Sequence, residues 1–475
     1  MKKIEMFFIL LFASLIPIIV YAIPSKPGNF NSASNVTHTG DITISSDTEE
    51  SDKTYTSSIG GRHALFFNSG TSKINNPTID KTGDSDGDEA DFYGINAAVF
   101  AHNGANVTIN GGNIKTNGAH ANAIFSYSTG IINLNDSIIN TISNNSGGVM
   151  VTGGGTLNAN NLTVKTMGNS SAAIRSDRGG GTLNVEKGSY ETNGVGSPVI
   201  YSTANVSVKD AVLTSNSSEG VVIEGFNSVS LNNVKLTDTN NSLNGNSETY
   251  KNIFIYQSMS GDADEGVGTF TSKDSNIVTN KGDTFFVTNT KANISLENNV
   301  IENNDQDFLR IQASKWGNSG SNGGNVTMTL TNQKVSGNII VDDISTLDLT
   351  IENSSVLESS INSENKSKNI TLKIDNNSVL SLQNDTYITK LENDSEDNSN
   401  IYSNGKYKLY VNGNEVSINE EIYKENNNLV ISKKETKHTS KSNLKYMYIL
   451  IGLLIIIITL SNVIIIKKLK NKSVK

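Results

Sequence analysis

The chain has no cysteine, and proline, tryptophan and arginine are all scarce. Its 475 residues include 5 prolines and 1 tryptophan, and the arginines are Arg62, Arg175, Arg178 and Arg310. Without cysteine there is neither a disulfide framework nor a thiolate metal site, so strand hydrogen bonds and an apolar core must stabilise the fold. The formal net charge of -9 and the lack of clustered arginine argue against a nucleic-acid partner.

The remaining composition is polar and rich in residues that form turns. Charged residues make up 18% of the chain, hydrophobic residues make up 36%, and there are 40 glycines. Polar residues alternate with Val, Ile and Leu at the period that places one side chain inward and the next outward in a strand. Disordered chains lack this alternation. The composition therefore favours one extended β-solenoid over several ordinary domains.

Short strands of similar sequence recur at nearly equal intervals. One alternating strand begins in turn at Val107, Ile132, Leu157, Leu183, Val206 and Val229, which gives steps of 25, 25, 26, 23 and 23 residues. A second apolar strand recurs in the same rhythm at Ala98, Ala123, Val149, Ala173 and Val199. One repeat buries too few apolar side chains to offset its ordering entropy, so neighbouring repeats must stack into a shared core. The repetition predicts a solenoid.

A column of asparagines and a set of boundaries follow from the same repeat. Asn110, Asn135 and Asn160 lie 25 residues apart, and stacked asparagines can hydrogen-bond along a column. We expect an irregular lead-in and N-terminal cap over 23–91 with a first coil near 73–79, then the β-helix over 92–380, and closing strands with a hairpin over 381–423. The pattern is interrupted over 241–267 by an insertion or a long loop. It resumes at Phe270, Ile294, Val326, Leu347 and Ile370.

Two apolar segments predict export and membrane anchoring. Lys2 and Lys3 precede an apolar stretch over 6–20, and the small-residue spacing up to Ala22 predicts a signal peptide over 1–22; an uncleaved anchor is the alternative. Residues 446–466 form an apolar run of about 21 residues, long enough to cross a bilayer core of about 30 Å. The lysines over 467–475 place a short tail in the cytoplasm, and 424–445 is expected to be a flexible stalk.

Five segments carry a resemblance to a known group of proteins. They are 83–88 (GDSDGD), 91–99 (DFYGINAAV), 171–181 (SAAIRSDRGGG), 194–202 (GVGSPVIYS) and 308–312 (FLRIQ). In these phrases the chain resembles bacterial and archaeal adhesin-like surface proteins with the pectin lyase-like fold. The resemblance covers about 82–413. It implies an all-β, right-handed parallel β-helix (solenoid) outside the cell, between a signal peptide and one C-terminal transmembrane helix, but no activity that transfers residue by residue.

We place candidate ligand-binding residues on the outer face of the second repeating strand. Alternation predicts an inward file of Val99, Ile124, Met150, Ile174 and Ile200. The adjacent outward file is Phe100, Phe125, Val151, Arg175, Tyr201 and Glu224, and a parallel file two residues on is His102, Tyr127, Gly153, Asp177 and Thr203. Aromatic rings stack on sugars, and charged groups bond their hydroxyls.

The candidate glycan-binding residues are therefore Phe100, His102, Phe125, Tyr127, Arg175, Asp177, Arg178 and Tyr201, with Trp316 of the glycine-rich loop over 315–324 as a further one. The alternative is that like residues stack for stability and that a loop covers this face. For Trp316 the alternative is packing against the side of the solenoid.

An acidic segment over 83–91 is a candidate calcium site. It contains four aspartates, Asp84, Asp86, Asp88 and Asp91, which are the candidate ligands, and also Glu89; carboxylate oxygens are the ligands that Ca²⁺ prefers. The glycine and distal glutamate of an EF-hand loop are missing, so a solvated acidic turn is the alternative. No other cofactor is expected.

Catalysis has weaker support in the sequence. A glycoside hydrolase needs two carboxylates about 5 to 9.5 Å apart, and the resemblance implies that a lyase needs a calcium cluster beside a basic residue. Only Arg175, Asp177 and Arg178 form a compact cluster. The positions that match Asp177 on the adjacent coils are Gly153 and Thr203, so no second acid completes a metal site there. We therefore expect no enzyme.

The sequence as a whole predicts a single-pass, adhesin-like protein of the cell membrane. Its large N-terminal region is expected outside the cell, where it binds a surface glycan, a host matrix or a neighbouring cell. A polysaccharide lyase or glycoside hydrolase of the pectin lyase-like fold and a purely structural surface-layer component are the alternatives.

Overall fold

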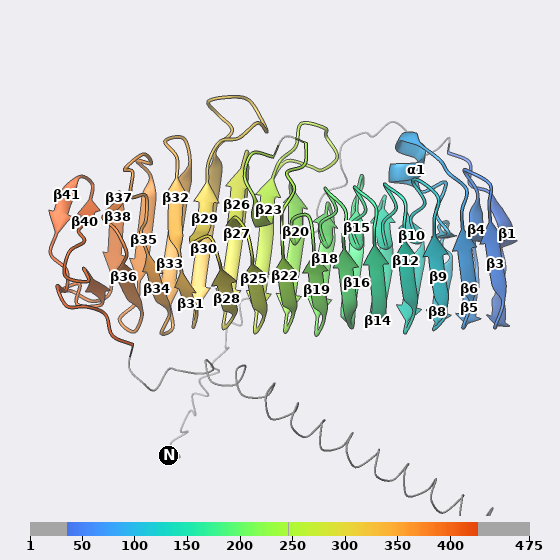
Figure 1. The fold of residues 1–475 in the computed structure, drawn as a ribbon, viewed down its shortest axis with the longest axis horizontal. Helices are drawn as coiled ribbons and strands as arrows, with labels where there is room; N and C mark the ends of the chain where they lie inside the picture. The colour runs from blue at the N-terminus through green and yellow to red at the C-terminus, as the bar shows by residue number, and fades with distance from the viewer. Residues whose placement is uncertain (1–35, 246, 426–475) are drawn as a thin grey trace, which may run out of the picture. The chain divides into compact units, whose positions relative to one another are not determined.

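A computed structural model describes residues 36–245 and 247–425, which form a stack of coils (Figure 1). Every pairing between the described strands is parallel except that between β40 (Leu409–Val411) and β41 (Asn414–Val416). The described residues contain one short helix, α1 (Gly87–Tyr93). The predicted all-β parallel β-helix is thus confirmed.

The membrane-related predictions are not covered by this structure. The signal peptide over 1–22, the span over 446–466, the tail over 467–475 and nearly all of the stalk lie outside the described residues. Among the residues that are described, no helix is both long and apolar enough to span a bilayer.

Twelve strands stack into the sheet that forms one face of the coils. In stacking order they are β1 (Gly40–Ile44), β4 (His63–Phe67), β7 (Val99–Ala101), β10 (Ile124–Tyr127), β13 (Val149–Thr152), β15 (Ile174–Ser176), β17 (Ile200–Ser202), β20 (Val221–Glu224), β23 (Lys251–Tyr256), β26 (Asp283–Thr288), β29 (Asp307–Ile311) and β32 (Asn338–Val341).

A 22-stranded sheet forms two further columns of strands. The first column is β2 (Thr48–Ser51), β5 (Thr71–Asn75), β8 (Asn106–Asn110), β11 (Ile131–Asn135), β14 (Gly155–Thr166), β16 (Gly181–Thr192), β18 (Asn205–Lys209), β21 (Ser228–Asn232), β24 (Val267–Lys273), β27 (Thr290–Glu297), β30 (Gly324–Thr331), β33 (Thr346–Glu352), β35 (Ile370–Ile374) and β38 (Lys390–Asn393). The second column is β3 (Thr54–Ser57), β6 (Thr78–Lys81), β9 (Asn113–Thr116), β12 (Ile138–Thr141), the second halves of β14 and β16, β19 (Val212–Ser215), β22 (Lys235–Asp238), β25 (Asn276–Thr279) and β28 (Val300–Asn303).

Two small sheets complete the C-terminal coils. One contains β31 (Lys334–Ser336), β34 (Val356–Ser359), β36 (Val379–Leu382) and β39 (Ile401–Tyr402). The other contains β37 (Thr386–Ile388) with the antiparallel hairpin of β40 and β41, whose turn is Asn412 and Gly413. The predicted closing hairpin is confirmed, and Asn-Gly is a favoured pair for such a turn.

The register of the coils follows the repeat in the sequence. The predicted strand starts stack as Cα partners from Val107 through Ile132, Leu157, Leu183 and Val206 to Val229. Their side chains point inward and are at most 2% exposed. The side-chain amide of Asn110 donates to Oδ1 of Asn75 at 3.0 Å, and that of Asn135 donates to Oδ1 of Asn110 at 3.0 Å. This part of the expected asparagine ladder is therefore present.

The coils begin earlier than the sequence pattern indicates. β5 and β6 lie at the first coil expected near 73–79, but their partners β2 and β3 and the pair of β1 and β4 also lie within the segment expected to be an irregular lead-in. The buried inward places include Ser57, Ser72 and Lys81, so the usual apolar alternation is missing there. The Nζ of Lys81 is satisfied by the carbonyl oxygens of Ile59 at 2.8 Å and Gly83 at 3.1 Å.

Two later predictions change in detail. The interruption over 241–267 contains β23, which continues the 12-stranded sheet, so that only the segments on either side of it are loops. The sequence pattern places Val326 after Ile294 in one inward row of side chains. In the structure Val326 pairs with Ala292, and Ile294 pairs with Met328. All four side chains are buried, so sequence alternation alone could not tell these two inward files apart.

Candidate functional site

The predicted outward file exists on the 12-stranded sheet. Parallel pairing places Phe100, Phe125, Arg175 and Tyr201 in one column. These residues are brought together from four different coils, as the repeat predicts.

The file needs a correction at its third coil and at its end. Met150 is the outward residue and Val149 the inward one, while Tyr127 pairs with Thr152 and not with Gly153. The error arises because a glycine, Gly148, precedes this strand where other coils have an apolar residue. At the end of the file Val222, not Glu224, follows Tyr201.

The aromatic rings in this file are covered. Phe100 and Phe125 are 0% exposed. The ring of His38 stacks on Phe100 with a centroid distance of 4.0 Å. Gly94, the C-cap of α1, lies so close to Phe125 that an added Cβ would stand 2.8 Å from the ring. The two rings proposed to bind a glycan therefore have no surface to offer one, which matches the alternative of a covered face.

His102 and Tyr127 lie at the edge of the same aromatic layer and are partly buried. The Nε2 of His102 is 2.9 Å from Oδ1 of Asn68, and the ring centroid of Tyr127 is 6.2 Å from that of Phe100. Burial lowers the pKa of His102 and raises the pKa of Tyr127. Both side chains therefore take part in packing the layer.

Arg178 joins two covering segments to the coils. Its Nε donates to Oδ1 of Asp262 at 2.6 Å, and its Nη1 donates to Oδ2 of Asp88 at 3.1 Å. The guanidinium also lies 3.7 Å from the ring centroid of Phe92. Asp262 belongs to the loop between β23 and β24, and the other two residues belong to α1. Arg178 thus binds α1 and the loop between β23 and β24 to the coils, and it is not a free cation for a ligand.

The remaining polar candidates form a buried cluster. Arg175 Nη2 donates to Oδ2 of Asp177 at 3.1 Å, while Oε2 of Glu224 accepts from the hydroxyls of Tyr201 at 2.6 Å and Tyr256 at 2.9 Å. Burial raises the pKa of Asp177 to about 6, an effect that the Arg175 guanidinium opposes. Burial also raises the pKa of Glu224, against its hydrogen bonds. Most of these polar atoms satisfy one another beneath the covering loops, but Nη1 of Arg175 makes no hydrogen bond within the described residues.

Two of the first three acids in the candidate calcium site have separate partners, and the other begins α1 without a side-chain capping bond. Oδ1 of Asp84 accepts from the backbone N–H of Ala119 at 2.8 Å, Asp86 is the N-cap residue of α1, and Asp88 pairs with Arg178. Within residues 36–245 and 247–425, no three His, Asp or Glu side chains are grouped so that they could hold a metal ion.

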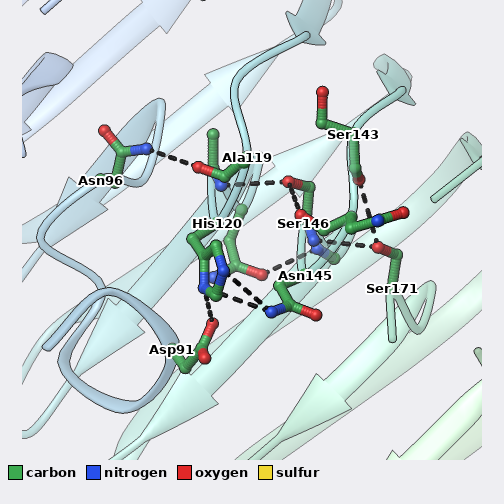
Figure 2. A network of polar contacts seen from close by, with 12 residues as sticks. Asp91, Asn96, Ala119, His120, Ser143, Asn145, Ser146 and Ser171 are labelled. Carbon is green, nitrogen blue, oxygen red and sulfur yellow. Dashed lines mark hydrogen bonds and ion pairs between the residues drawn. The ribbon is translucent and has the colours of Figure 1, made fainter. Parts of the chain in front are cut away.

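The fourth acid, Asp91, docks α1 against a corner of the coils (Figure 2). Its Oδ1 lies 2.7 Å from Nδ1 of His120, whose Nε2 lies 3.0 Å from Nδ2 of Asn145. A nearby chain of corner bonds includes the backbone N–H of Ser146, which donates to Oγ of Ser171 at 2.9 Å. The imidazole contacts an amide and not a hydroxyl, so it does not activate a serine nucleophile.

An open groove lies between two loops, residues 257–266 and 312–323, and has a volume of about 560 Å³. Its lining residues are Gln257, Ser258, Met259, Glu265, Gly266, Asn289, Thr290, Lys291, Gly317, Asn318 and Ser321. Most of them carry amides or hydroxyls, with one acid and one base. Figure 1 shows long loops protruding from one edge of the coils in this part of the stack.

The walls of the groove are held in place by packing and hydrogen bonds. The ring of Trp316 lies 4.9 Å from that of Tyr256, and its carbonyl oxygen accepts from Nδ2 of Asn322 at 2.8 Å. Asn289 Nδ2 donates to the carbonyl oxygen of Gln257 at 2.8 Å. Trp316 thus packs against the solenoid, which is the alternative stated for it above. It also supports the loop that places the next residue, Gly317, in the groove lining. The groove is preformed, and this lowers the cost of binding.

One acceptor in the groove wall has no partner. Gln257 is 7% exposed, and its Oε1 makes no hydrogen bond within the described residues. This Oε1 is closed to solvent and lies beside Gly225, so it belongs to the packing behind the wall and offers no acceptor to a ligand. Sequence reasoning missed the groove, although two signals lay beside it: the interrupted repeat over 241–267 and the glycine-rich loop over 315–324.

Comparison of the chain with protein-family models, with curated proteins and with solved structures produced no match.

Proposed function

We propose that this protein is a cell-surface binding module that recognises a glycan in the groove between residues 257–266 and 312–323. The observation that carries the proposal is a preformed, mostly uncharged groove of about 560 Å³ whose lining residues mostly carry amides or hydroxyls. Ligand sites commonly combine such a shape with a few placed polar groups. Sugars supply hydroxyls to amide and hydroxyl partners, and Met259, 65% exposed, offers an apolar contact.

Binding without catalysis has the better support. Glycoside hydrolysis uses two carboxylates that flank the scissile bond, and one carboxylate, Glu265, is among the groove-lining residues. Asp177 and Glu224 have elevated pKa values, but both are buried under the covering loops. A ligand in the groove would meet hydrogen-bonding groups and not a pair of acid and base.

The location is part of the same proposal. The apolar N-terminal segment and the apolar run over 446–466, followed by lysines, support an exported single-pass membrane protein. An adhesin-like role at the cell surface, through host matrix or a neighbouring cell, would use the solenoid to present the groove.

The groove variant Asn318→Ala should weaken glycan binding about tenfold, which corresponds to the loss of about 1.4 kcal/mol. Asn318 lines the groove and is exposed, so the substitution should leave the fold intact. The measurement is binding of purified full-length protein to a glycan array, followed by titration with the glycans that bind. Asn113→Ala, an exposed asparagine on β9 outside the groove, is the matched control.

Failure of the wild-type protein to bind any glycan on the array would refute the proposed function. Equal losses in Asn318→Ala and Asn113→Ala would show that the groove is not the site.

A further inference from the structure

The first column of the 22-stranded sheet presents a long uncharged polar surface. The "hydroxyl–amide face" is defined here as the outward side chains aligned with Asn106 and Thr108 in nine consecutive strands, β8, β11, β14, β16, β18, β21, β24, β27 and β30. Two positions in each of nine strands make 18, and 17 of these are Ser, Thr or Asn, with Ile131 as the exception. None of the 18 is buried.

This composition is confined to two outward positions of each strand and to one stretch of the column, because the next outward position on the same strands carries Glu186, Lys209, Lys273 and Glu297. The face ends at Lys73 in the strand before it and at Asp348 in the strand after it. In the second column of the same sheet, the outward side chains include five charged ones, which are Lys115, Lys165, Glu191, Lys235 and Glu302. Both columns have the same strand geometry, so the coil architecture does not account for the difference.

Side chains of the face are aligned by bonds between coils. Nδ2 of Asn158 donates to Oδ1 of Asn133 at 2.8 Å, and Nδ2 of Asn184 donates to Oδ1 of Asn158 at 2.9 Å. Oγ of Ser228 donates to Oδ1 of Asn205 at 2.8 Å. An amide in such a ladder keeps a second N–H and a second lone pair for another partner. These groups are ordered before a ligand arrives, which reduces the entropy lost on binding.

The face is continuous with the groove. Thr290 and Lys291, at the start of β27, line the groove. Asn293 and Ser295 follow on the same strand and belong to the face. Lys291 and Asn293 are two residues apart, or about 6.7 Å along a strand. A polymer that leaves the groove therefore meets the face directly.

We infer that the groove is one part of a longer binding surface for an extended neutral polysaccharide, which continues over the hydroxyl–amide face. This inference rests on the proposed glycan-binding function. The face has no lysine or arginine for an anionic polymer, and with one exposed apolar side chain and no aromatic it lacks the anchors of a protein interface. Its amides and hydroxyls match a neutral polymer rich in hydroxyls. Eight steps of about 4.8 Å give a length of about 38 Å.

Chain length is the variable that tests this inference. Purified full-length protein is titrated with cello-oligosaccharides and chito-oligosaccharides of two to eight sugars, and is sedimented with cellulose and chitin. We expect affinity to rise at least tenfold from the shortest to the longest member of one series. Binding should change little between low and high salt because the face is uncharged.

Charged pairs on the two columns provide matched variants. Ser207→Lys with Ser230→Lys places two lysines on the face in β18 and β21, and should remove the gain with chain length. Thr214→Lys with Thr237→Lys places two lysines on the second column in β19 and β22 of the same coils, and should leave it intact. Asn318→Ala in the groove should weaken short and long chains alike.

Three results would overturn the inference: no binding of either series, affinity independent of chain length, or equal losses in the two lysine pairs. Length-independent binding that Asn318→Ala still weakens would leave the proposed function standing. The inference would also fail if the wild-type protein were a dimer and Ser207→Lys with Ser230→Lys, but not Thr214→Lys with Thr237→Lys, made it a monomer. The hydroxyl–amide face would then join two copies of the chain.

Discussion

At the residue scale, two histidines attach the segment before β1 to the aromatic layer. Nδ1 of His63 lies 2.9 Å from the carbonyl oxygen of Ala97, so this nitrogen is the N–H donor and Nε2 is an acceptor. Nδ1 of His38 lies 3.2 Å from that Nε2 and donates to it. This arrangement requires the His63 ring to be neutral, because its Nε2 accepts a hydrogen bond. Burial is the main cause that lowers the pKa of His38 to about 4 and that of His63 to about 3.

The His38 and His63 pair should contribute a loss of stability on mild acidification. The unfolded histidines have a pKa of about 6.5, so the unfolded state binds more protons than the folded state between pH 6.5 and 4. Their contribution to stability therefore falls as the pH falls through this window, by at most about 1.4 kcal/mol per pH unit for each histidine, whereas buried Asp177, with a pKa of about 6, contributes in the opposite direction. The urea midpoint at pH 7 and pH 5 measures the loss. His38→Phe keeps the stacking on Phe100 and should reduce the difference; an unchanged difference would contradict this assignment.

At the element scale, α1 is held by its contacts and not by its own helix propensity. Seven residues are too few for a stable isolated helix. The helix is fixed by Arg178 through Asp88, by His120 through Asp91, and by the contact of Gly94 with Phe125. Its position over the aromatic column explains why that column is closed to ligands.

Two glycines in this element allow a matched test of its docking. Gly94 has φ 73° and Gly87 has φ 75°, but an added Cβ would meet Phe125 at Gly94 and nothing within 4 Å at Gly87. Both alanine variants carry the cost of a left-handed residue, about 1 kcal/mol. Gly94→Ala should lose about 1 to 3 kcal/mol more by overpacking, measured as the free energy of unfolding in urea. Equal losses would show that α1 does not press on Phe125.

At the scale of the whole described stack, each coil packs on its immediate neighbours. The core is one continuous cluster of buried side chains from Ile44 to Leu409. Stability in such a solenoid is close to a sum of coil terms and terms between adjacent coils. Damage to one coil should therefore spread mainly to the coils beside it.

Leu183→Ala should test this local character. Leu183 is fully buried between Leu157 and Val206, and removal of its side chain should cost about 2 to 5 kcal/mol. Hydrogen exchange should show the largest loss of protection in β14, β16 and β18, with little change in β33 and β35. Asn184→Ala, the exposed neighbour, should stay within about 0.5 kcal/mol of the wild type. Uniform loss of protection along the stack would contradict the solenoid description.

Repeat spacing alone predicts the coils, their register and the closing hairpin. The prediction succeeds because each strand pairs with the strand one repeat later. Residues one repeat apart in the sequence, such as Val107 and Ile132, are therefore also neighbours in the sheet. The method fails where the pattern changes. Polar inward residues such as Ser57 hid the first coils, and Gly148 shifted the outward file by one residue.

Tertiary structure decided which surfaces are open. The sequence places Phe100 and Phe125 on an outward file, and the structure agrees, but segments far away in the chain cover both rings. The groove depends in the same way on two loops brought together by stacking. Periodicity records which way a side chain leaves its own strand. Whether solvent or another segment lies there depends on contacts between coils, for which a repeat carries no local signal.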